Sequence, residues 1–226
     1  FFTPFQTDRE NQSITPTQPY SAIDVVATED GTNVQFTLPA GISASFGAPI
    51  STRPGGSTFS VTLNRGQTFS LYPNNFSRLA ANRLRGVEIN SSSPIAVTVK
   101  DDSFLHTSGT CYDLAGDQLV STDIISKEYA AIRTFLNNHD HIYILATEDN
   151  TTVTIYNPDG TIPATTTPGA LANPRVLNAR QQHYVRLPDT FTHYRIIADK
   201  PVYVWHVGGF GCEAGGAILP PIDKCT

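Results

Sequence analysis

The segment 111–118, with the sequence CYDLAGDQ, carries the residue types best suited to recognise a ligand. Tyr112 offers an aromatic surface, while Asp113, Asp117 and Gln118 supply hydrogen-bond acceptors and donors between small residues. An aromatic surface with a few polar groups nearby is ordinary chemistry for binding sugars or peptides. Residues of these types more often bond to loop backbone and cover the edge of a core. We nevertheless take these four residues as the ligand-binding candidates.

The only histidine-rich segment is NNHDH at residues 137–141. If it were a strand, His139 and His141 would point to the same side and could bind a metal ion with a third ligand. The polarity of the segment favours an exposed loop instead, so no metal site is predicted. The GxSxG, HExxH and phosphate-loop motifs are absent, and no pair of carboxylates can be placed at glycosidase distances from sequence alone. We therefore expect no enzyme activity and no cofactor.

A near-repeat places two acidic residues at equivalent positions: ATEDGTNVQF at residues 27–36 and ATEDNTTVTI at residues 146–155. The carboxylates of Glu29 and Asp30, or of Glu148 and Asp149, could contribute to a cation site, which for calcium requires six to eight oxygen ligands. Asp-Gly and Asp-Asn before a Thr-rich strand are instead typical of tight hairpin turns, with the Asp side chain bonded to nearby backbone amides. The turn interpretation is favoured.

Further landmarks repeat in the same order along the chain. The first phrase recurs at an offset of 119 (146 − 27), the LN phrase beginning at Leu63 and Leu177 at 114, and the prolines Pro94 and Pro201 at 107. A weaker match aligns SGTCYDLAGDQLVS at residues 108–121 with GFGCEAGGAILPPI at residues 209–222. Conserved order across several landmarks indicates duplication of one unit. We predict a first β unit at residues 1–127 and a second at 128–226.

Each unit contains short segments rich in Val, Ile, Thr and Phe, with alternating polarity and turn residues between them. No helical periodicity persists for three turns. The fold class predicted is all-β, with two tandem antiparallel β-sandwich units. A β-propeller-like arrangement of four-stranded sheets is the alternative, because strand spacing does not distinguish the two. Trp205 lies in a strand-like segment, and we expect it in the core rather than on a binding surface.

The composition of the chain limits the classes of partner and the cellular compartment that we expect for it. The net charge is −5, charged residues make up 15% of the chain, and the basic residues are scattered, which argues against a nucleic-acid partner. No apolar run is long enough for membrane insertion. The three cysteines fit an oxidising compartment, and we predict a disulfide between Cys212 and Cys225, the pair that closes the shortest loop. Cys111 would then be free or bonded to a flanking unit.

Four stretches match the N-glycosylation pattern. They begin at Asn11, Asn75, Asn90 and Asn150. Their modification depends on the host.

The ordered blocks resemble the bacterial relatives of the IgGFc-binding protein N-terminal domain family. The resemblance rests on ATEDGTNV and ATEDNTTV, LNRGQ, SSSPIAV and ADKPVYV, CYDLAGDQLVS followed by ISKEY, and the closing GCEAGGAILPPIDKCT. It implies extracellular, non-catalytic modules of large secreted or surface-attached proteins that adhere to or retain glycoproteins. Binding of immunoglobulin itself is not implied for this chain.

Three functional hypotheses follow. The first is an extracellular or cell-surface adhesion, binding or spacer module of a larger bacterial protein, with a glycoprotein or glycan as its partner. The second is a fibre subunit that assembles with further copies of itself through strand edges, suggested by the apolar FFTPF at residues 1–5. The third is a carbohydrate-active enzyme.

Overall fold

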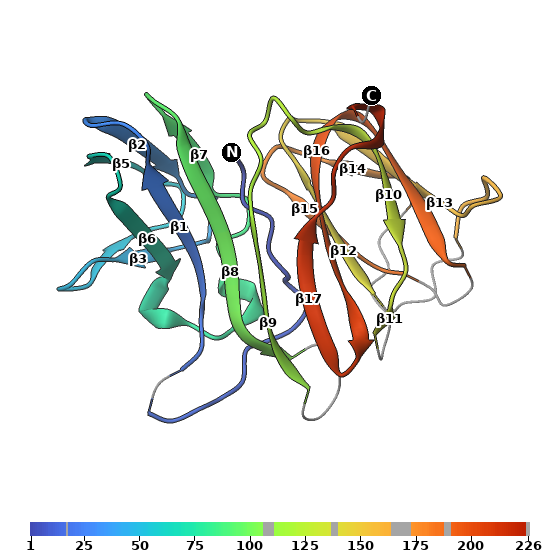
Figure 1. Cartoon of the computed structure of the whole chain (residues 1–226), viewed down its shortest axis with the longest axis horizontal. Coiled ribbons are helices and arrows are strands. Elements are labelled where there is room, and N and C mark those ends of the chain that lie inside the picture. Colours follow the sequence, from blue (N-terminus) through green and yellow to red (C-terminus); the bar gives the residue numbers. More distant parts are fainter. Residues whose placement is uncertain (17, 106–110, 137–139, 164–172, 188–190, 225–226) are drawn as a thin grey trace.

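The computed structural model describes residues 1–16, 18–105, 111–136, 140–163, 173–187 and 191–224 (Figure 1). Strands dominate it, and three short 3-10 helices are its only helical elements within these ranges. Strand pairs are antiparallel except for β11 (Phe135–Leu136) against β16 (His193–Gly211), which is parallel. The expected all-β class is confirmed.

The first half of the chain forms two sheets that enclose a core. The larger has the order β4-β3-β6-β1-β8-β9, and the smaller has the order β5-β2-β7. The strands are β1 (Ser21–Ala27), β2 (Thr32–Thr37), β3 (Ala44–Phe46), β4 (Ser51–Arg53), β5 (Thr58–Leu63), β6 (Thr68–Pro73), β7 (Glu88–Ser91), β8 (Ile95–Leu105) and β9 (Tyr112–Gln118). The helices η1 (Asn74–Phe76) and η2 (Ala80–Asn82) follow β6.

Alternation of polarity explains how these strands face the core. In β2, Thr32, Val34 and Phe36 are buried, while Asn33 and Gln35 between them are exposed. Successive side chains of a strand point to opposite faces, so this sequence buries one face and exposes the other to solvent.

The second half forms one eight-stranded sheet around β16. Its main path is β14-β13-β16-β12-β15, and β10, β11 and β17 also pair with β16. The remaining strands are β10 (Ser126–Ile132), β12 (His141–Ala146), β13 (Thr151–Tyr156), β14 (Arg175–Leu177), β15 (Gln182–Arg186) and β17 (Glu213–Ile218), and η3 (Ile222–Lys224) follows. Sheets of three, six and eight strands do not match the four-stranded sheets of the propeller alternative.

The halves have equivalent strand pairings in the same register. β1 and β12 each lie between two antiparallel neighbours, β6 and β8 in one case and β15 and β16 in the other. Val25 lies opposite Phe69 and Val97, and Ile144 lies opposite His183 and Val204. These positions differ by the same offsets, 119, 114 and 107, that align the sequence. The pairings support our proposal that one unit was duplicated.

The two halves are not separated by a gap in the core. One hydrophobic cluster contains first-half residues such as Phe36 together with Tyr143, Trp205 and Val207 of the second half. Phe5 is fully buried in it, with its ring 6.0 Å from that of Trp205. The boundary at residues 127 and 128 therefore stays a prediction about sequence units, because the packing is shared across it.

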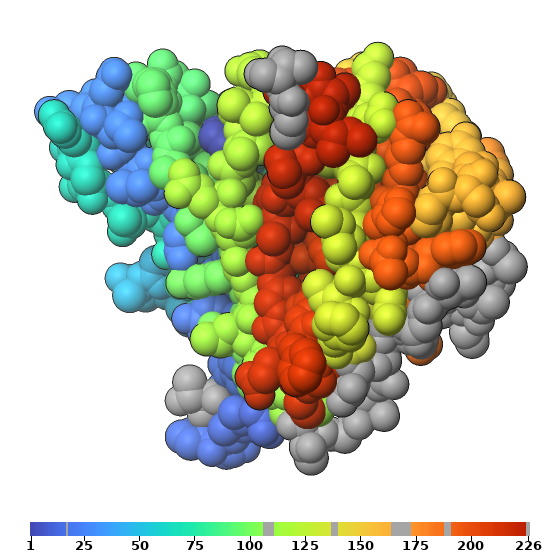
Figure 2. Space-filling view, turned by 45° about the vertical axis from the view of Figure 1, so that its right-hand side comes forward, coloured from blue at the N-terminus to red at the C-terminus, as the bar shows by residue number. Residues whose placement is uncertain are grey.

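The strands β9 and β17 lie side by side where the halves meet, as Figures 1 and 2 show. At one end of this seam Cys111 forms a disulfide with Cys212, with the two Cα atoms 5.4 Å apart. The predicted pairing of Cys212 with Cys225 is therefore wrong. Loop entropy favours close cysteines in sequence, but the fold brings the start of β9 to the β16–β17 turn. Cys225 lies outside the described residues.

Candidate functional site

Two of the predicted ligand-binding residues, Asp113 and Asp117, form hydrogen bonds across the seam between β9 and β17. The Asp113 carboxylate accepts a hydrogen bond from the Ala214 backbone N–H at 2.7 Å, and the Asp117 carboxylate accepts one from the Ile218 N–H at 2.8 Å. These side chains satisfy backbone donors along the edge of β17, where a neighbouring strand would supply carbonyls. They join the two halves of the chain.

The other two candidates remain accessible. Tyr112 is half-buried, and Gln118 is exposed at the end of β9. The structure therefore places the four predicted residues on one strand, β9, where the two carboxylates bind the backbone of β17. Ligand binding by Tyr112, Asp113, Asp117 and Gln118 stays a prediction.

The repeated acidic residues bridge adjacent turns. Asp30 accepts a hydrogen bond from the Arg65 N–H at 2.9 Å, and Asp149 accepts one from the Ala179 N–H at 3.0 Å. The same side chain thus performs the same backbone contact in both halves. This geometry agrees with the favoured turn interpretation rather than with a cation site.

The expected exposed loop at residues 137–141 is wrong for the part that the structure describes, since Asp140 is fully buried and His141 is 3% exposed. The Asp140 carboxylate lies 2.8 Å from His206 Nε2 and accepts hydrogen bonds from the Thr134 N–H and hydroxyl at 2.7 and 2.8 Å. Burial tends to raise the pKa of Asp140, but the hydrogen bonds from His206 and Thr134 outweigh it and the pKa is lowered. His206 and Thr134 bind the buried carboxylate in place of water. The residues next to Asp140 in the sequence do not reveal that His206 is its partner.

His141 has a carboxylate partner of its own. Its Nδ1 lies 3.3 Å from the Asp8 carboxylate, which also accepts a hydrogen bond from the Tyr143 hydroxyl. Burial opposes ionisation of Asp8, but the hydrogen bonds from His141 and Tyr143 prevail, so its pKa is lowered. Among the described residues, no group of three His, Cys, Asp or Glu side chains is arranged to hold a metal ion.

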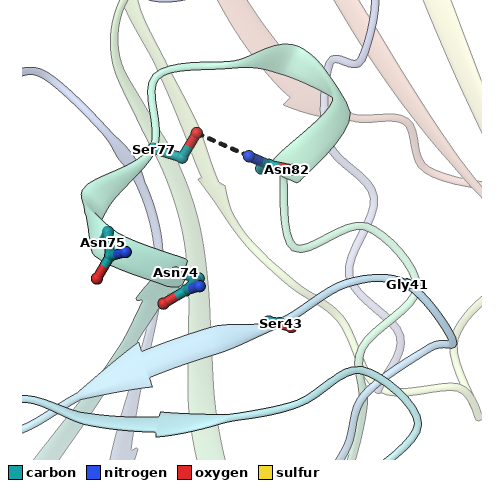
Figure 3. Close-up of a pocket in the computed structure, with 6 residues that line it drawn as sticks. All are labelled: Gly41, Ser43, Asn74, Asn75, Ser77 and Asn82. Atoms are coloured by element: carbon teal, nitrogen blue, oxygen red, sulfur yellow. Dashed lines mark hydrogen bonds between the residues drawn. The ribbon is translucent and has the colours of Figure 1, made fainter.

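A polar pocket lies elsewhere, in the first half, between the turn before β3 and the η1–η2 segment (Figure 3). Its volume is about 400 Å³. Three asparagines, two serines and one glycine line it: Gly41, Ser43, Asn74, Asn75, Ser77 and Asn82. These lining side chains are uncharged hydrogen-bonding groups. We refer to this site as the amide pocket.

Contacts along the η1–η2 segment fix the walls of the amide pocket. The Asn74 N–H donates to the Ser43 carbonyl at 3.2 Å, and the Asn82 amide donates to the Ser77 hydroxyl at 2.8 Å (Figure 3). The next residue, Arg83, is fully buried and forms an ion pair with Asp101 of β8, with Nε 2.7 Å from the carboxylate. The segment is thus anchored to the larger sheet.

The backbone at this pocket adopts an uncommon conformation. Asn75 and Phe76 have φ values of 54° and 51°, in the left-handed region. Asn enters this region more readily than most residues, whereas Phe does so rarely, and each such residue costs on the order of 1–3 kcal/mol. Two aromatic rings hold Phe76: Tyr72 stacks on it at 4.4 Å and Tyr20 meets it edge-on at 4.9 Å.

The groups that line the amide pocket are suited to hydrogen bonding rather than to proton transfer. Amide and hydroxyl groups donate and accept hydrogen bonds, but they do not exchange protons near neutral pH as a general acid or base must. Sequence reasoning missed this site, because its two walls, Gly41 with Ser43 and the asparagines of residues 74–82, are far apart in the chain. The only local signal is Asn75-Phe76-Ser77, which matches the glycosylation pattern.

The four glycosylation patterns differ in accessibility. Asn11 is 2% exposed and accepts a hydrogen bond from Arg83, so its amide faces the protein interior. Asn75, Asn90 and Asn150 are exposed. Only the last three present their side chains to solvent in the folded chain.

Comparison with known proteins places these features in a family. A family model described as IgGFc binding protein matches residues 6–222, nearly the whole chain. Curated proteins and solved structures give no match. Within the described residues, no helix combines the length and apolar character needed to cross a membrane.

Proposed function

The chain belongs to the IgGFc binding protein family, a family of extracellular binding domains rather than enzymes, and from this premise we propose that it recognises a glycoprotein through the amide pocket. The module would serve adhesion to, or retention of, that partner as part of a larger secreted or cell-surface protein. It would do so without catalysis of its own.

The observation that carries this proposal is the composition of the amide pocket. Six residues from two segments of the chain surround a volume of about 400 Å³, within the range typical of ligand sites. Gly41 and Asn75 at its margin are exposed, so a partner can reach it. The strained backbone at Asn75 supports the same interpretation, since strain of this kind clusters at functional sites.

The fibre hypothesis has less support. It rests on the apolar FFTPF segment, yet Phe5 is buried in the core of its own chain and Thr3 bonds to Val87. This segment occupies a place within the chain, so it provides no argument for joining another copy.

Binding to immobilised glycoproteins tests the proposal, with surface plasmon resonance on a panel that includes mucins, fetuin and ribonuclease B. The informative variant is Asn75→Gly, which removes the pocket amide while glycine accepts the left-handed backbone without strain. We expect at least a tenfold loss of affinity, equivalent to about 1.4 kcal/mol.

A matched control exists in the second half. Asn150 has a φ of 55° and is exposed in a turn far from the pocket in sequence, so Asn150→Gly makes the same change elsewhere. We expect this variant to bind as the native chain does. Equal binding by the native chain and Asn75→Gly, or no binding to any member of the panel, would contradict the proposed function.

A further inference from the structure

We propose that the amide pocket binds a neutral sugar, whose apolar face packs on the aromatic cluster of Tyr20, Tyr72 and Phe76. This inference rests on the proposed function and specifies the part of the partner that the pocket recognises. It names the carbohydrate, rather than the polypeptide, as the ligand.

The aromatic cluster lies next to the lining residues of the pocket in the chain. Tyr72 and Phe76 flank the lining residues Asn74 and Asn75 in the chain, and their rings stack on each other at 4.4 Å just outside the lining itself. Tyr20 contacts both rings, at 5.8 Å and 4.9 Å between centroids. All three aromatic residues are only partly buried. A partly exposed aromatic surface beside hydrogen-bonding groups presents both an apolar and a polar contact to one ligand.

The second argument is the match between pocket groups and sugar hydroxyls. A sugar hydroxyl both donates and accepts, and so does each amide and hydroxyl side chain that lines the pocket. Ser43 already accepts from the Gly55 N–H and Ser77 from the Asn82 amide, but each of these groups has further donor or acceptor capacity for a ligand, and none is charged. A peptide would need its backbone donors and acceptors met by an open strand edge or an extended groove, whereas this site is a compact pocket.

The nearby arginines are already paired with carboxylates, which restricts the ligand to neutral sugars. Arg78 forms an ion pair with Glu10, and Arg83 forms the buried ion pair with Asp101. The two cations that directly follow lining residues in the chain are thus paired within the protein. The lining itself contributes no charged side chain. A sialylated or sulfated sugar would bring an anion to a lining that offers no cation for it.

The test is a glycan array and calorimetry with the intact chain, its Phe76→Leu variant and a Phe135→Leu control. Leucine at position 76 keeps an apolar side chain but removes the ring, whereas Phe135 is 73% exposed in the other half of the molecule, beside Phe210. We expect binding to glycans that end in neutral hexoses or N-acetylhexosamines. Affinity should fall about tenfold or more in Phe76→Leu and stay unchanged in Phe135→Leu.

Two treatments distinguish a neutral sugar from a charged sugar or one held through calcium. Removal of sialic acid by neuraminidase should leave binding intact or increase it, and EDTA should have no effect. Loss of binding after neuraminidase, dependence on calcium, or equal affinity of Phe76→Leu and the native chain would overturn the inference. Circular dichroism of Phe76→Leu checks that the fold is kept, and Tyr72→Phe, which keeps the ring, should bind normally if stacking is what matters.

Failure of this inference can be told apart from failure of the proposed function. If an enzymatically deglycosylated glycoprotein binds as well as the intact one and Asn75→Gly still weakens it, the pocket recognises polypeptide and only the sugar inference fails. If neither Asn75→Gly nor Phe76→Leu changes any binding, the pocket is not the contact site and both fail.

Discussion

The two halves of the chain share a framework but differ in what connects their strands. In the first half, β3 and β4 lie between β2 and β5, and residues 74–87 with η1 and η2 lead from β6 to β7. In the second half, the corresponding step from β15 to β16 spans only residues 187–192. The amide pocket forms between the turn before β3 and the longer connection of the first half, residues 74–87.

This comparison separates scaffold from site. Residues that align between the halves, such as Asp30 and Asp149, perform the same backbone contact in each. Four of the six lining residues stand in residues 74–87, a connection that is longer than its counterpart at residues 187–192. Shared features therefore report how the fold is built, and the difference indicates where a ligand would be recognised.

The largest expected effect comes from separating the halves at the seam. Replacing Cys111 and Cys212 by serine removes a crosslink between residues 101 positions apart. A loop of this length corresponds to about 4–5 kcal/mol of stability in the chain-entropy account. Urea unfolding should show a much lower midpoint for the double variant, and the native chain under reducing conditions should match it. An unchanged midpoint would mean that the seam holds without the disulfide.

A smaller loss of stability should come from one buried residue of the second half, His183, as the pH falls. His183 occupies the position equivalent to Phe69, opposite Ile144 as Phe69 is opposite Val25. Burial, with a lesser contribution from the charge of Arg175, lowers the pKa of His183 to about 4. The unfolded chain therefore binds more protons between pH 6.5 and about 4, and stability falls as pH drops through this window, by about 3 kcal/mol at most.

Exchange between the halves tests this assignment. The variant His183→Phe restores the first-half residue, and its unfolding midpoint should change less than that of the native chain between pH 6.5 and 4. The pKa values of Asp8 and Asp140 are lowered in the folded chain, so protonation of these two carboxylates removes stability only at a pH below this window. Identical pH profiles for both proteins would show that another group titrates in the window.

The smallest effect distinguishes the seam from the pocket. Asp117→Ala leaves the Ile218 N–H without its acceptor and should cost about 1–2 kcal/mol of unfolding free energy. Gln118→Ala, at the exposed neighbouring position, is the control and should change stability little. Binding to glycoproteins should be the same for both variants and the native chain. Loss of binding in Asp117→Ala without loss of stability would instead restore β9 as the ligand site.

Sequence alone predicts what local pattern determines. Alternating residues such as Val34 and Phe36 indicate the strands, Asp30 lies in the expected turn, and Trp205 lies in the core as its segment suggests. These features depend on near neighbours along the chain, or on hydrophobicity, both of which are visible in a single sequence.

The errors all concern partners that are distant in sequence. Asp140 is polar and its neighbours predict solvent exposure, but His206, 66 positions away, satisfies it inside the fold. The shortest loop pairs Cys212 with Cys225, although Cys111 is the residue that the fold brings to it. The amide pocket could not be predicted, because Gly41, Asn75 and Asn82 meet only after the sheets have formed.

The strand β16 determines how the sheet of the second half can unfold locally, because most strands of that sheet pair with it. Its single uninterrupted run of 19 residues pairs with β10, β11, β12, β13 and β17, so its backbone is the common partner of most of that sheet. Its first part, up to Ala198, pairs with β13, and its part from Val202 onward pairs with β12 and β17, so a shift by one residue within either part would reverse inward and outward side chains for the strands paired there. Loss of the β16 pairings would therefore open most of this sheet together, and we expect the amide protons of its partner strands to exchange as one cooperative unit.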